Sequence, residues 1–179
     1  RASRSAGTAG SPSAPPRVHL PRRPKSAGSQ SPEVQQSGGS VARVRSKSAA
    51  RLNAAGVVQV ERGELEAAIA LFTQAIEADP RYALAYFDLG NVLDETGRVQ
   101  DAVQTYKTAL QLAPTYADAH YNLALAYEKL REPRKALKHW QAYIRLDTSG
   151  PWSVHARSQI KRILQADGLK LVYKRAENR

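Results

Sequence analysis

The 179-residue chain contains neither cysteine nor methionine. The lack of cysteine excludes disulfides, a thiolate nucleophile and cysteine-ligated metals. No apolar run approaches the ~18 residues of a membrane span, and residues 1–16 lack the apolar core of a secretory signal. These absences predict a cytoplasmic protein with no membrane segment. Because there is no initiator methionine, we also expect a processed product or a fragment of a longer reading frame.

Residues 1–48 have few large apolar side chains and no aromatic ones. Pro, Gly and Ser make up 22 of these 48 residues, which is above the ~25–30% typical of low-complexity segments. So little apolar surface does not offset the entropy that a chain loses on ordering. We therefore predict a disordered basic tail over residues 1–47.

Positive charge is concentrated at the two ends of the chain. Of the formal net charge of +11, residues 1–48 contribute +8 and residues 151–179 contribute +5. Residues 49–150 carry a net charge of −2. The high pI therefore belongs to the ends, and the middle of the chain is mildly acidic.

The middle of the chain repeats every 34 residues. The segments 49–82, 83–116 and 117–150 align without gaps. Each segment reads as two helices separated by a short turn, and Pro80 and Pro114 follow the second helix of the first two segments. The turns fall near Gly63, Gly97 and Arg131. A fixed period of this length is typical of a repeat architecture.

Small and large residues occupy matching places in the three segments. The first helices carry Gly56, Gly90 and Ala124 at one place, and the second helices carry Phe72, Tyr106 and Trp140 at another. A small residue lets two helix backbones approach closely, and the facing ring fills the adjoining space. The pattern predicts tightly packed helical pairs.

These places resemble the signature of the tetratricopeptide repeat family. The middle segment carries the signature residues Tyr86, Leu89, Gly90, Ala102, Tyr106, Ala109 and Pro114. The resemblance implies an all-α fold, a right-handed α-solenoid of three helix-turn-helix repeats (48–150). It also implies a concave face that binds a peptide or protein segment. More loosely, the chain resembles bacterial modules in which such repeats follow a helix-turn-helix or another regulatory segment.

Helical periodicity indicates which residues line that concave face. In the first helix of the middle segment, Leu84, Phe87 and Asn91 lie opposite the residues that pack between helices. With their equivalents in the other segments, the predicted groove consists of Asn53, Val57, Leu84, Phe87, Asn91, Asp94, Glu95, Asp118, Tyr121, Leu125 and Glu128.

The predicted groove combines apolar and acidic side chains. Our hypothesis is a partner segment that is basic and has apolar anchors. The alternative is that Phe87 and Tyr121 pack on neighbouring helices and that the acids form a solvated face. Some members of the family bind a C-terminal carboxylate with Lys and Arg on this face. The corresponding places here lack those bases, so we do not expect that mode of binding.

No motif in the sequence indicates catalysis. The four histidines form no metal-binding motif, and there is no G-x-S-x-G, P-loop or dinucleotide-binding glycine pattern. We therefore expect a protein that is not an enzyme and that needs neither cofactor nor metal.

Nucleic acid is the alternative class of partner. The basic ends can neutralise phosphates, although residues 1–48 have no aromatic side chain to stack on bases. A solvated linker is the competing interpretation of the N-terminal tail. A third possibility is that this tail lies in the acidic groove and competes with partners.

Residues 151–166 begin like a fourth repeat and then diverge from it. A fourth repeat would bury Arg157 and Lys161 without partners, which is costly. On a helix beginning at Pro151, one stripe is apolar and the other side is polar. The apolar stripe consists of Trp152, Ala156, Ile160 and Ile163. We therefore predict a capping helix over 151–166 that ends the array, followed by a basic tail at 167–179.

Overall fold

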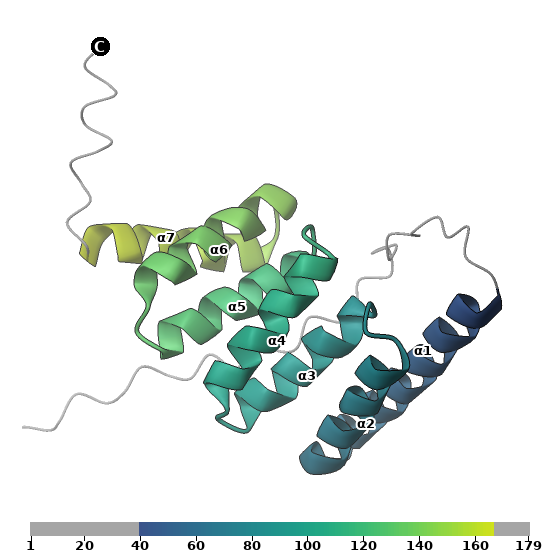
Figure 1. Ribbon diagram of the computed structural model, residues 1–179. Helices are drawn as coiled ribbons and strands as arrows, with labels where there is room; N and C mark the ends of the chain where they lie inside the picture. The colour runs from purple at the N-terminus through teal and green to yellow at the C-terminus, as the bar shows by residue number, and fades with distance from the viewer. Residues whose placement is uncertain (1–39, 167–179) are drawn as a thin grey trace, which may run out of the picture. The chain divides into compact units, whose positions relative to one another are not determined.

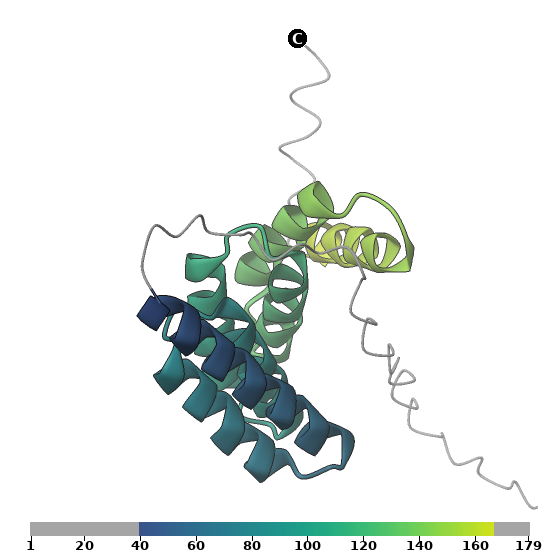
Figure 2. The ribbon, with the colours of Figure 1, turned by 90° about the vertical axis from the view of Figure 1, so that its right-hand side faces the viewer.

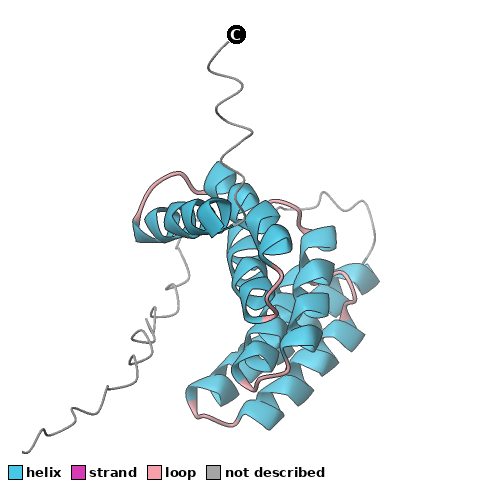
Figure 3. Ribbon diagram, turned by 90° about the vertical axis from the view of Figure 1, so that its left-hand side faces the viewer, coloured by secondary structure: helices cyan, strands magenta, loops and turns pink. Residues whose placement is uncertain are grey.

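The computed structural model describes residues 40–166, so the predictions for 1–39 and 167–179 lie outside it. The described part consists of helices and short connections, without strands (Figure 3). The helices are α1 (Ser40–Glu61), α2 (Leu65–Ala78), α3 (Ala83–Glu95), α4 (Val99–Leu112), α5 (Ala117–Lys129), α6 (Pro133–Leu146) and α7 (Pro151–Ala166). The all-helical fold is confirmed, and α1 begins upstream of the boundary expected at residue 48.

The first six helices form three pairs that follow one another in chain order (Figure 1). Within each pair the two helices lie side by side, as α1 and α2 do in front of the other helices in Figure 2. The second helix of a pair also packs against the first helix of the next pair. The three 34-residue segments therefore correspond to three structural repeats.

The same turn joins the two helices of every pair. Gly63 and Gly97 have φ of 79° and 82°, and Arg131 has φ of 57° at the equivalent place. The residue after each of them donates its amide hydrogen to a carbonyl five residues earlier, as in Glu64 to Gln59 at 2.9 Å. This hydrogen bond ends the first helix of the pair. The residue just before the donor has the left-handed backbone conformation. Arg131 holds that conformation without glycine's freedom, at a cost of about 1 kcal/mol.

Each pair is held at close range by a ring placed over a small residue. A Cβ added to Gly56 would lie 2.5 Å from Phe72 Cε1, and one added to Gly90 would lie 2.6 Å from Tyr106 Cε1. Phe72 and Tyr106 are both 1% exposed. There is consequently no room for a side chain at either glycine. The expectation of small residues facing large rings is confirmed at both places.

Helix α7 occupies the place of a first helix, and it is the last helix within residues 40–166. It starts 34 residues after α5, and it packs against α6. Ser153, Ala156 and Ile163 are buried, whereas Arg157 and Lys161 are exposed. Its apolar stripe faces the third repeat and its basic side meets solvent. This is the single closing helix that the sequence predicted.

We predict that Gly90→Val lowers the free energy of unfolding by about 1–3 kcal/mol, because overpacking a filled interface forces shifts of side chains and backbone. The ring of Tyr106 has no room to move aside, since its hydroxyl also donates to Asn91 Oδ1 at 2.9 Å. Urea denaturation measures the effect. Ala70→Val, on the exposed side of α2, is the control and should change stability by a few tenths of a kcal/mol. Equal effects of the two substitutions would contradict this account of the packing.

We also predict that ending the chain at Gly150 produces an aggregating or partly unfolded protein. Without α7, the rings of Tyr121 and Trp140 lose the cover of Trp152 and His155, and terminal repeats need a polar outer face to remain soluble. Size-exclusion chromatography and thermal melting test this. A chain ending at Ala166 is the control and should stay monodisperse; a soluble and equally stable shorter chain would show that α7 is dispensable.

Candidate functional site: a polar face across the odd-numbered helices

The predicted site residues lie on the first helices of the repeats, and polar contacts join these helices side by side. Asn53 Nδ2 on α1 donates to Asp88 Oδ2 on α3 at 2.8 Å. Further contacts join α3 to α5 and α5 to α7. We call this surface the odd-helix face, and we define it by the residues Asn53, Asp88, Asn91, Asp94, Tyr121, Asn122, Glu128, Lys129, His155 and Arg162.

An asparagine pair links α3 and α5 at the centre of the odd-helix face. Asn91 Oδ1 accepts hydrogen bonds from Asn122 Nδ2 at 2.7 Å and from Tyr106 Oη at 2.9 Å. These two donors fix which way the Asn91 amide points. Asn91 Nδ2 and Asn122 Oδ1 have no hydrogen-bond partner within residues 40–166. Both side chains are half-buried, so the face presents one amide donor and one amide acceptor next to each other.

An ion pair lies closer to the C-terminal ends of the same two helices. Lys129 Nζ is 2.6 Å from Asp94 Oδ2, and the two side chains are 50% and 21% exposed. Asp94 Oδ1 is buried and has no hydrogen-bond partner among residues 40–166, and the same holds for Asn53 Oδ1. The acidic charge expected at Asp94 is therefore balanced by a base from the next repeat.

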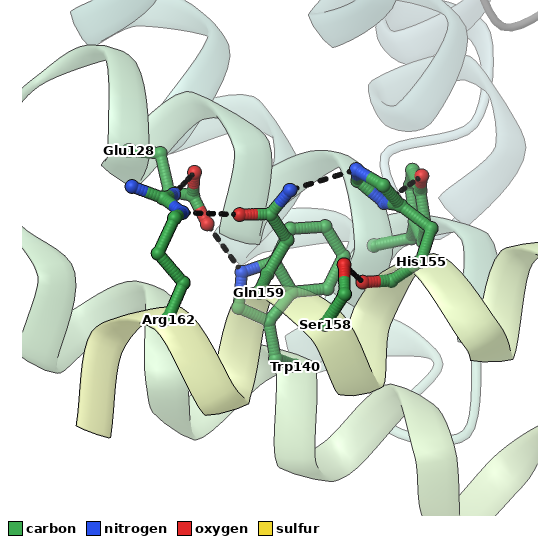
Figure 4. A network of polar contacts seen from close by, with 7 residues as sticks. Glu128, Trp140, His155, Ser158, Gln159 and Arg162 are labelled. Atoms are coloured by element: carbon green, nitrogen blue, oxygen red, sulfur yellow. Dashed lines mark hydrogen bonds and ion pairs between the residues drawn. The ribbon is translucent and has the colours of Figure 1, made fainter. Parts of the chain in front are cut away.

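A continuous polar network joins α5, α6 and α7 (Figure 4). Glu128 accepts hydrogen bonds from Trp140 Nε1 at 2.7 Å and from Arg162 Nη2. Arg162 Nε also donates to Gln159 Oε1 at 2.8 Å, and Gln159 Nε2 donates to His155 Nε2 at 2.9 Å. Because His155 Nε2 accepts this bond, the proton of the neutral ring lies on Nδ1.

The network reaches Tyr121, which packs beneath α7. His155 Nδ1 lies 2.7 Å from Tyr121 Oη and donates to it. The Tyr121 ring is 6% exposed and makes edge contacts with Trp140, Tyr143 and Trp152 at centroid distances of 4.9, 5.1 and 5.2 Å. Burial, with a smaller effect of Glu128, raises the pKa of Tyr121. Its hydroxyl group therefore remains protonated at physiological pH.

The other predicted groove residues differ in their surroundings. Phe87 is half-buried, and its ring lies 4.7 Å from that of Tyr116 and 6.0 Å from that of Tyr106. Asn53 is 2% exposed, whereas Glu95 is exposed. The remaining predicted residues, Val57, Leu84, Asp118 and Leu125, are half-buried.

The contribution of α7 to the odd-helix face was not predicted from the sequence. His155, Gln159 and Arg162 lie in the helix predicted as a cap with one polar side, yet all three belong to the network with α5. The 34-residue period could have indicated these contacts. His155 lies 34 residues after Tyr121, and Arg162 lies 34 residues after Glu128, as expected for neighbouring first helices.

A pair of histidines lies away from this face, between α5 and α6. His120 Nδ1 is 3.0 Å from His139 Nδ1, and His120 Nε2 donates to the carbonyl oxygen of Pro114 at 3.1 Å. Burial lowers the pKa of His139 to about 4, and the neighbouring His120 and Lys138 add to the effect. Burial also lowers the pKa of His120 and of His155, against the opposing effects of the Pro114 carbonyl group and of Glu128 respectively.

Residues 40–166 contain neither a cluster of metal ligands nor a membrane-spanning helix. No group of three or more His, Cys, Asp or Glu side chains is placed to hold a metal ion in that range. Nor does any of its helices have the length and apolar character required to cross a membrane.

Stacked helical pairs with a polar face across their first helices define the chain as a helical-repeat scaffold. Two family profiles, both described as tetratricopeptide repeat, match residues 53–117 and 95–148, and together they span more than half of the chain. The chain belongs to the tetratricopeptide repeat family, whose fold serves protein interaction. No curated protein matches its sequence.

Similar solved structures include tetratricopeptide repeat proteins. The first such domain of Spaghetti (RPAP3), bound to the HSP90 peptide SRMEEVD, has a TM-score of 0.64 and 20% identity over 69% of this chain and 95% of that one. MamA has a TM-score of 0.62 and 25% identity over 72% of this chain and 78% of its own. YrrB, titled a TPR protein with an unusual peptide-binding site, has a TM-score of 0.61 and 27% identity over 66% of this chain and 59% of its own.

The lowered pKa values of His120, His139 and His155 predict that the free energy of unfolding falls on mild acidification. Their folded-state pKa values are lowered, so the unfolded chain binds more protons between about pH 6.5 and pH 4 and stability is lost as the pH falls through this window. Allowing for solvent screening, we expect a loss of about 1 kcal/mol.

Urea midpoints at about pH 7.5 and about pH 5.5 measure this loss, because Asp and Glu with ordinary pKa values stay ionised at both. His139→Gln should make the difference between the two midpoints smaller. The control His19→Gln lies outside the described residues and should leave the difference as it is. A midpoint that does not depend on pH would contradict the prediction.

Proposed function

We propose that the protein is a protein-interaction module whose odd-helix face binds an extended or helical protein segment. The asparagine pair is the observation that carries the proposal. Asn91 Nδ2 and Asn122 Oδ1 offer a donor and an acceptor side by side, which is the pairing that a peptide backbone complements with its C=O and N–H groups. Because Tyr106 holds Asn91 in place, little side-chain entropy is lost on binding.

Apolar anchors of the partner would lie beside the asparagine pair. Leu84, Phe87 and Leu125 come from the same two helices and are half-buried, so each retains apolar surface that a partner can cover. Covering apolar surface contributes roughly 25 cal/mol per Å². We propose that Tyr121 supports this surface from beneath α7 and does not contact the partner directly.

The acids of the odd-helix face are paired with bases, and this pairing affects which partner segment binds. Asp94 and Glu128 are paired with Lys129 and Arg162, which lowers the preference for a basic segment that the acids alone would produce. Such charges favour specificity and encounter rate more than affinity. We therefore propose a partner segment with apolar anchors and modest basic character.

Two structural neighbours differ in what they support. The Spaghetti domain is 20% identical and supports the shared fold alone. YrrB is 27% identical, and it is described as having an unusual peptide-binding site. The proposal for this chain rests on its own asparagine pair.

A displayed library of random peptides tests the proposal. We expect the full chain to enrich peptides, and Asn91→Ala/Asn122→Ala to weaken the binding of those peptides by at least about tenfold, because two hydrogen bonds of about 1 kcal/mol each are lost. The matched control Gln74→Ala/Gln111→Ala removes two exposed amides from α2 and α4 and should bind as the unchanged chain does.

A second variant separates binding from folding. Leu84→Ala leaves the asparagine hydrogen bonds in place and should weaken binding while the thermal melt shows a folded protein. If the full chain enriches no peptide, or if the asparagine variant binds as tightly as its control, the proposed site is wrong.

A further inference from the structure

Helix α1 is longer than the other first helices, and the extra length is basic. It has 22 residues, whereas α3 and α5 each have 13. The first repeat starts at Ala49, which is also the first buried residue of α1. Residues 40–48 therefore extend beyond the repeat and form the dark-blue end of α1 in Figure 1. Both family profiles leave this extension unmatched.

Three bases form a row that begins in this extension and continues into the first repeat. Arg43, Lys47 and Arg51 are spaced by four residues and all are exposed, so they form one stripe along α1. We call these three residues the basic stripe. A spacing of four residues is a rise of about 6 Å, close to the ~7 Å by which two successive nucleotides advance along the axis of a DNA duplex.

The basic stripe weakens the helix that carries it. Bases near the positive N-terminal end of a helix oppose its dipole, and like charges four residues apart repel each other. No acidic residue occurs between Ser40 and Val60 to offset them. An uncovered helix end of this length is also marginally stable by itself. A bound polyanion would relieve both kinds of repulsion.

The charge of the adjoining sequence has the same sign. Residues 1–60 contain ten Lys and Arg and one acid, Glu33. We propose that the basic stripe binds the phosphate backbone of a nucleic-acid duplex, independently of base sequence. Residues 1–60 contain no aromatic side chain to stack on unpaired bases, which favours a duplex over a single strand. An anionic membrane fits less well, because the extension's only exposed large apolar residues are Val41 and Val44.

The test measures binding of the full chain to a labelled DNA duplex of about 20 base pairs by fluorescence anisotropy, between about 50 and 200 mM salt. We compare the full chain with the stripe variant Arg43→Gln/Lys47→Gln/Arg51→Gln. Each phosphate contact contributes about 0.9 to the slope of log K against log salt. The stripe variant should therefore lose about 2.7 of that slope and at least about tenfold in affinity near 100 mM salt. Gln has nearly the helix propensity of Lys and Arg, so the fold should be kept.

A control variant removes the same charge elsewhere. Arg81→Gln/Lys107→Gln/Lys138→Gln also lowers the net charge by three at exposed positions of the repeats, and its slope should match that of the unchanged chain. Duplexes of unrelated sequence should bind equally, and a single strand should bind no more tightly.

Several results would overturn the proposal. Equal effects of the two variants would mean that net charge alone drives binding, and no effect of either would place binding outside the basic stripe. The proposal also fails if the full chain binds anionic phosphatidylserine vesicles but no duplex. Because the odd-helix face is unchanged in both variants, none of these results bears on peptide binding.

Discussion

The architecture of this protein depends on glycine residues at the points where the two helices of a pair approach each other closely. Gly56 and Gly90 leave no space for a Cβ beneath Phe72 and Tyr106, so each ring fixes the separation of its helical pair. Tyr106 on α4 also uses its hydroxyl to orient Asn91, the residue that follows Gly90 on α3. The buried Tyr106 side chain thus packs inside the repeat and also orients a side chain of the odd-helix face. The geometry of the odd-helix face depends on this packing.

Side chains about one repeat period apart form polar contacts between neighbouring repeats, in addition to the packing within each repeat. Contacts between Asn53 and Asp88, and between Asp94 and Lys129, join residues 35 positions apart, and the contacts of α7 with α5 join residues 34 apart. Each first helix thus offers partners to the helix one period later. Among the described residues, α7 is the last member of this series: it supplies the polar contacts of a first helix, and its Arg157 and Lys161 are exposed.

The sequence predicted the fold well because the repeat is local and periodic. Turn residues, small residues and rings recur at fixed places, and each helical pair forms from residues close in the chain. The site was less predictable, since a helical wheel indicates which side of a helix a residue occupies but not which neighbour it meets. Tyr121 occupies the predicted side of α5, yet α7 covers it. The pairing of Asp94 with Lys129 also depends on how two helices are offset, which periodicity alone does not determine.

The ends of the repeat array differ in the way their charge is arranged. On α7, Arg162 is tied to Glu128 and its neighbours, so one basic residue becomes part of the repeat structure. On α1, Arg43 and Lys47 precede the first buried residue and Arg51 follows it, all three are exposed, and no acid occurs before Glu61. Charge that is neutralised within the fold contributes to specificity, whereas charge held away from the fold acts on distant anions through solvent. The two arrangements therefore suit different tasks, structural closure at α7 and electrostatic attraction at α1.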